Sequence, residues 1–169
     1  MSMRFDLFLD GVMSCGAWPA RRGHDVNLQC VAVSLAGALG TSVSVKLLGH
    51  GQYTTVLHVE AGGYTVAVKF VRGVSPEVDW ALLLHEFTSE ARTLALFEHQ
   101  KLELQAVRHV GQFYTSATTV PLLLLESYDN YFQLGHLFTL PPTPFWMECM
   151  RHVLFQIVFT LADLQLAYT

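Results

Sequence analysis

The segment from Leu47 to Phe70, LLGHGQYTTVLHVEAGGYTVAVKF, limits the possible folds more than any other part of the chain. Two apolar, alternating stretches flank the Gly62-Gly63 pair, and alternation with period two indicates strands with one buried face. A Gly-Gly dipeptide favours a two-residue hairpin because both residues tolerate positive φ. Residues 42–70 therefore predict a strand, a glycine turn, a strand, a hairpin and a third strand.

Lys69 closes the last of these strands in a strongly apolar context. A buried ammonium needs a carboxylate partner because burying an unpaired charge is very costly. The next segment opens at Ser75-Pro76, a plausible helix start, and its helix offers two candidate partner carboxylates, Glu86 and Glu90. Its apolar residues recur at spacings of three and four, the stripe of an amphipathic helix: Leu83, Phe87, Ala91 and Leu94.

The rest of the chain completes an α+β pattern. Residues 1–40 read as an irregular leader with a strand at Met3–Leu9, and CVAVSLAGALG fits either a strand or a short helix. Further strands are expected at Gln105–Gly111 and Thr119–Glu126. Residues 42–126 thus predict a five-stranded antiparallel sheet with one helix, centred near Glu86–Leu96, packed across it. After LPPTP, the segment Phe145–Tyr168 predicts a long, mostly buried helix outside the sheet.

Composition excludes several classes of protein. With 51% hydrophobic and 14% charged residues, the 169-residue chain has ample material for the core of one domain or one lobe. A net charge of -4 with scattered Lys and Arg argues against nucleic-acid binding. The eight histidines form no metal-binding motif, and no apolar run predicts a membrane span. Three cysteines without a CxxC pair, and a poor secretory signal, favour an intracellular, cytoplasmic protein.

The stretch LGHGQYTTV, followed thirteen residues after Val56 by the lysine of VAVK, resembles the N-terminal lobe of protein kinases. The resemblance runs from about Val45 to the end of the chain. It implies an N-terminal extension at 1–41, a kinase-like N-lobe at 42–128, and the hinge exit with the first helices of an incomplete C-lobe at 129–169. FTLADLQLAYT is similar to the corresponding region of divergent kinases of large DNA viruses.

The same resemblance implies an ATP site. Lys69 would pair with nucleotide phosphates and Glu90 with Lys69, while Glu86 stays the alternative one turn earlier. Gly49 and Gly51 would let backbone N–H groups approach phosphate oxygens. Ala67 shares a strand face with Lys69 and would leave room for a flat ring. The remaining nucleotide-contacting positions are Leu48, Tyr53, Val56, Leu125 as the gatekeeper, and Glu126 to Tyr128 as the hinge.

The chain also departs from the family pattern. Thr54 replaces the third loop glycine, and the sequence ends at Thr169, where the catalytic loop of a kinase would begin. Magnesium would need ligands from the C-lobe, so we expect weak or no ATP binding and no phosphotransfer by these 169 residues alone. Residues 145–168 would then expose an apolar helix to self-association or a protein partner. Two alternatives stay open: a short non-catalytic kinase-like interaction module, or an unrelated α+β binding protein.

Overall fold

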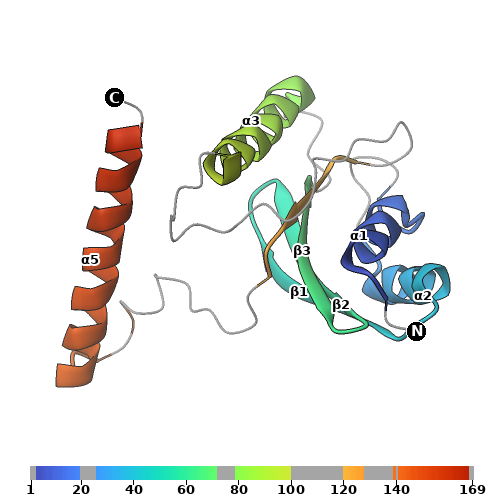
Figure 1. Ribbon diagram of the computed structural model, residues 1–169, viewed down its shortest axis with the longest axis horizontal. Coiled ribbons are helices and arrows are strands. Elements are labelled where there is room, and N and C mark those ends of the chain that lie inside the picture. Colours follow the sequence, from blue (N-terminus) through green and yellow to red (C-terminus); the bar gives the residue numbers. More distant parts are fainter. Residues whose placement is uncertain are drawn as a thin grey trace. The chain divides into compact units, whose positions relative to one another are not determined.

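A computed structural model describes residues 3–19, 26–71, 79–99, 120–127, 139 and 141–167. The chain forms two compact units, residues 1–96 with 107–127 and residues 97–106 with 128–169, and each is described by itself. The first unit is a mixed α+β structure around a four-stranded antiparallel sheet of order β1-β2-β3-β4 (Figure 1). Its strands are β1 (Val43–His50), β2 (Thr54–Ala61), β3 (Tyr64–Val71) and β4 (Leu122–Leu125).

The β2–β3 hairpin has the predicted turn. Ala61 pairs with Tyr64, and the two residues between them, Gly62 and Gly63, have φ of 58° and 85°. L-residues with side chains rarely adopt such angles, so this pair of glycines fixes the register of the hairpin. The register between β1 and β2 shifts between Leu47 and Gly49.

The sheet has four strands, so the prediction of five was wrong for the residues that the structure describes. The strand expected at Thr119–Glu126 is confirmed as β4, which pairs antiparallel to β3. The other expected strand, Gln105–Gly111, lies outside the described residues. The antiparallel arrangement itself is confirmed.

The N-terminal residues form helices rather than an irregular leader. Helix α1 (Phe5–Ser14) replaces the strand predicted at Met3–Leu9, because Phe8 and Val12, four residues apart, share one helix face and are both fully buried. Of the two readings of CVAVSLAGALG, the helix is correct: it lies in α2 (Leu28–Leu39). The Asn27 side chain caps that helix, and Gly40 ends it with φ of 64°.

Helices α1 and α2 cover one face of the sheet, which we call the outer face (Figure 1). Trp18 belongs to the same cluster, and its indole N–H donates to the carbonyl oxygen of Val12 at 2.6 Å. Alternate residues of β2, β3 and β4 supply much of this core, all of them apolar: Leu57, Val59, Ala61, Val66, Val68, Phe70, Leu122 and Leu124.

Helix α3 (Trp80–His99) packs on the opposite face, which we call the inner face. The predicted stripe is confirmed: Leu83, Phe87 and Ala91 are buried against the sheet, and Leu94 is partly buried beside them. The helix starts one residue after Asp79, whose carboxylate accepts from the Ala81 N–H at 2.9 Å. The start expected at Ser75-Pro76 lies outside the described residues.

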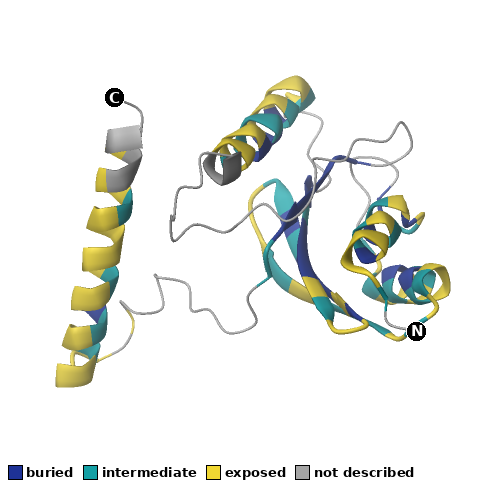
Figure 2. Ribbon diagram, in the orientation of Figure 1, coloured by how far each residue is buried: buried dark blue, intermediate teal, exposed yellow. Residues whose placement is uncertain are grey.

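Helix α5 (Pro144–Ala167), in the second unit, matches the predicted terminal helix, but the prediction that it is mostly buried was wrong. Among its described side chains Met150 is buried, and most of the others are exposed (Figure 2). The large exposed apolar residues are Phe145, Met147, Leu154, Phe155, Ile157, Val158, Phe159 and Leu161. Apolar residues surround the helix, a pattern that predicts burial from sequence whether or not a partner covers it.

In the part of the chain that the structure describes, no helix combines the length and apolar character needed to cross a membrane.

Candidate functional site

The inner face carries an ion pair between a strand and a helix. Lys69 Nζ in β3 donates to both carboxylate oxygens of Glu90 in α3, at 2.8 Å and 2.7 Å. The Lys69 side chain is 20% exposed and that of Glu90 is 39% exposed. Glu86, one turn earlier in α3, is exposed, so the structure selects the carboxylate that the sequence favoured.

The pair leaves the lysine able to bind a further group. An ammonium has three N–H donors, and among the residues that the structure describes Glu90 is the partner of Lys69. Because the lysine side chain is mostly but not fully buried, its remaining donor capacity can be directed to an incoming anion. The carboxylate fixes the position of the ammonium before any ligand arrives.

Apolar side chains surround this charge. Val56 of β2 and Leu123 of β4 are the Cα partners of Lys69 on either side. Ala67 and Leu125 lie two residues away on the same face, where they are 5% and 8% exposed. Two other predicted contact residues, Leu48 and Tyr53, are partly buried against the same cluster.

Leu123 was missed by the sequence analysis. The run Leu122–Leu125 is apolar at every position, and all four residues are buried. A run without alternation does not show which residues share the face of Lys69, and this follows only from the pairing of β3 with β4. Of the residues of β4, Leu125 was the one predicted to contact the ligand.

Two glycines lie near the turn between β1 and β2, Gly49 within β1 and Gly51 in the turn itself. A Cβ at Gly51 would meet Thr54 Oγ1 at 2.8 Å, and the Gly51 N–H donates to the Thr54 carbonyl at 2.8 Å. A side chain at position 51 would therefore force the Thr54 hydroxyl to move, and the Gly51 N–H is already used within the turn. A Cβ at Gly49 would meet no atom within 4 Å, and Gly49 pairs with Val56 on the adjacent strand. The space beside Gly49 is open.

The predicted hinge is only partly described. Glu126 and Ser127 follow β4 and are half-buried, whereas Tyr128 lies outside the described residues. Ser127 contacts a residue that the sequence analysis did not single out. His58 of β2 is 1% exposed, and its Nδ1 lies 2.6 Å from Ser127 Oγ. The signal for His58 was its position two residues after Val56, on the same strand face.

Metal ligands are not gathered at this site. Among the described residues, no group of three His, Cys, Asp or Glu side chains lies close enough to hold a metal ion. The inner face offers an ammonium held by Glu90, open space beside Gly49, and the apolar side chains of Val56, Ala67 and Leu125. This combination suits an organic anion with an apolar ring.

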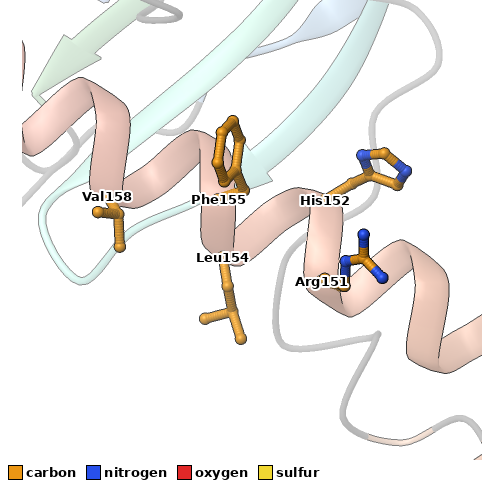
Figure 3. Close-up of a pocket in the computed structure, with 5 residues that line it drawn as sticks. All are labelled: Arg151, His152, Leu154, Phe155 and Val158. Atoms are coloured by element: carbon orange, nitrogen blue, oxygen red, sulfur yellow. The ribbon is translucent and has the colours of Figure 1, made fainter.

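A concave surface of about 450 Å³ lies on α5 and is lined by Arg151, His152, Leu154, Phe155 and Val158. These side chains point in different directions from one helix, with Leu154 and Phe155 on opposite sides (Figure 3). Glu148 lies 3.3 Å from His152 and 4.0 Å from Arg151, in ion pairs exposed to solvent. Because its polar groups do not converge, this surface lacks the usual features of a small-molecule site.

No known family model, curated protein or solved structure matches this chain. What the chain does must therefore be inferred from the inner face itself.

Proposed function

We propose that the inner face is the nucleotide site of a protein-kinase-like lobe, in which Lys69 binds phosphate oxygens and Glu90 holds Lys69 in place. The observation that carries this proposal is the two-point bond from Lys69 Nζ to Glu90, made by a side chain that is only 20% exposed. Stability alone does not explain the Lys69–Glu90 pair, because replacing a buried ion pair with apolar residues of similar volume is often neutral or stabilising.

The other inner-face residues indicate where the phosphates and the adenine ring of the nucleotide would each bind. Gly49 leaves open space near the end of the sheet where Lys69 lies, because it pairs with Val56 and Val56 pairs with Lys69. Phosphates belong there, within reach of the ammonium. An adenine ring belongs along Val56, Ala67 and Leu125, with the backbone after β4 at its polar edge.

Lys69 and Glu90 act by position and charge. The carboxylate keeps the ammonium from turning out to solvent, so binding a phosphate oxygen costs little further side-chain ordering. Magnesium, which accompanies ATP in kinases, takes oxygen ligands, and the described residues do not form such a group. No metal-dependent step is assigned to these residues, and binding by this chain alone is expected to be weak.

Nuclear magnetic resonance on the labelled 169-residue chain tests the proposal. Millimolar ATP should shift the amide signals of Gly49, Val56 and Lys69 and leave those of outer-face residues such as Leu35 unchanged. Lys69→Met should remove most of the effect, whereas Lys46→Met, at an exposed position of β1, should not. Absence of inner-face shifts, or equal shifts in the Lys69→Met variant, would favour an unrelated α+β binding protein.

A second candidate function, a kinase-like interaction module, is favoured by the exposed apolar residues of α5. Phe155 and Val158 are 62% and 63% exposed, and such surfaces mark interaction sites. The expected occupant is a second copy of the chain. Light scattering should show a mass that rises with concentration, reduced by Phe155→Glu but not by Gln156→Glu, which adds the same charge at the next exposed position. A monomer at all concentrations would exclude this function.

A further inference from the structure

His58 links two strands that are not neighbours. It lies in β2, while its partner Ser127 follows the end of β4, and β3 lies between these two strands. The contact from Nδ1 to Ser127 Oγ measures 2.6 Å, and the imidazole is 1% exposed. A hydroxyl both donates and accepts, so this bond can form with either neutral tautomer of the imidazole.

The register of the sheet places His58 and Ser127 on the same face, on either side of β3. His58 pairs with Ala67, and Ala67 pairs with Leu125, so the three residues form one row across the inner face. Adjacent strands are roughly 5 Å apart, which places β2 and β4 about 10 Å from each other. Ser127 lies two residues beyond Leu125, toward the level of Thr65. At this level of the inner face, β3 carries Ala67 and Thr65, whose small side chains leave room for the contact between His58 and Ser127.

Ser127 lies at the boundary between the two compact units. It is the last residue of the first unit, and the next residue, Tyr128, belongs to the second. The bond to His58 thus fixes the inner-face sheet to the point where the chain leaves it. Glu126 and Ser127 are the described residues of the segment proposed to face the nucleotide base.

We propose that His58 is a positioning residue for base recognition: by holding Ser127 across β3, it sets the backbone of Glu126 and Ser127 at the correct level for an adenine ring. This inference rests on the proposed nucleotide site. It assigns separate tasks to these two polar contacts of the inner face. Lys69 and Glu90 serve the phosphates, and His58 with Ser127 serves the base.

Two substitutions separate the positioning bond from simple loss of a histidine. His58→Asn keeps an amide atom near the place of Nδ1 and can still reach Ser127. His58→Gln carries its amide further out, near the place of Nε2, and loses that bond. His85→Gln, at an exposed position of α3, is the matched control. In the ligand-free chain, the Ser127 amide signal should move in His58→Gln and return towards its native position in His58→Asn.

Binding is then measured with two partial ligands, adenosine and inorganic tripolyphosphate. His58→Gln should weaken adenosine binding by roughly three- to tenfold, the effect of one net hydrogen bond, and leave tripolyphosphate binding unchanged. His58→Asn should recover most of the adenosine affinity. Lys69→Met should show the opposite preference and lose tripolyphosphate binding first.

The outcomes distinguish this inference from the proposed function. If the native chain binds neither probe on the inner face, both are overturned. If the native chain binds both probes but His58→Gln binds adenosine as well as the native chain does, only the positioning role is wrong. Equal losses for adenosine and tripolyphosphate, or equal losses in His58→Gln and His58→Asn, would also overturn it, because they would indicate a general structural effect.

Discussion

The two faces of one sheet differ in chemistry although the same strands build them. The outer face is a closed apolar core, in which α1, α2 and Trp18 cover alternate residues of the strands. The inner face is interrupted by His58, Lys69 and the Glu90 carboxylate, all buried or half-buried. Folding explains the first face, because apolar burial is its main driving force. The second face carries polar groups that folding does not require, and it is therefore the place to look for function.

The comparison predicts that the outer face controls stability. Phe8 is fully buried there, and Phe8→Ala should lower the free energy of unfolding by about 3–5 kcal/mol, since it leaves a large cavity. Leu7→Ala, at a position 55% exposed on the same helix, is the control and should change it by less than about 0.5 kcal/mol. Urea unfolding followed by circular dichroism measures both. Similar values for the two variants would show that α1 does not belong to the core.

The ion pair should matter less for stability and more for binding. Glu90→Ala is expected to cost about 1–2 kcal/mol, between the values for surface and buried pairs, because the carboxylate is partly solvated. The same substitution should weaken nucleotide binding. Glu86→Ala, at an exposed position one turn earlier, should do neither. If Glu86→Ala had the larger effect, the assignment of the partner carboxylate would be wrong by one turn.

The helix caps allow a matched test of the two faces. Asn27 caps α2 on the outer face and Asp79 caps α3 on the inner face, each by accepting backbone N–H bonds. Replacing either with Ala should cost about 1 kcal/mol in the free energy of unfolding. Only Asp79→Ala should also weaken nucleotide binding, because α3 carries Glu90. Loss of binding in Asn27→Ala would contradict the separation of tasks between the faces.

The smallest effect is expected at the start of α1. The Arg4 guanidinium, hydrogen-bonded to Asp6, holds the pKa of that carboxyl below its usual value of 3.8. A carboxyl with a lowered pKa in the folded chain contributes stability above its unfolded pKa and loses it as the pH falls through the folded value. Asp6→Asn should therefore lower the free energy of unfolding slightly at neutral pH and leave it unchanged at strongly acid pH, which flattens the acid limb of the stability curve. A loss of stability in Asp6→Asn that stays the same from neutral to strongly acid pH would contradict this assignment.

The sequence predicted local features better than contacts across the sheet. The β2–β3 hairpin, the stripe of α3 and the pairing of Lys69 with Glu90 followed from periodicity, the Gly-Gly turn and the resemblance. At the N-terminus the strand prediction was wrong, because a short apolar segment does not reveal that Phe8 and Val12 pack on one side of a helix. For α5, apolar composition predicted burial, but composition does not say what covers a helix.

The bond between His58 and Ser127 shows a different limit. It joins positions 69 residues apart, and its geometry depends on the order and register of three strands. From the sequence, the small size of Ala67 was explained by the space that a flat ring needs. The structure adds a second reason, because Ala67 is the Cα partner of His58 and a small side chain there leaves room for the imidazole on the same face.

The central claim is that Lys69 contacts the phosphates of a nucleotide, and a lysine-directed probe tests it most directly. An acyl-phosphate derivative of ATP transfers its acyl group to a lysine amine next to the bound phosphates. The chain contains two other lysines: Lys46, exposed on β1, and Lys101, outside the described residues. Both serve as internal controls when labelled peptides are quantified by mass spectrometry.

We expect Lys69 to be labelled faster than Lys46 although it is more buried, and excess ATP to suppress labelling at Lys69 alone. Glu90→Gln should reduce this preference, since the ammonium is then held less firmly. Labelling that follows exposure, with Lys46 ahead of Lys69 and no protection by ATP, would contradict a nucleotide site on the inner face.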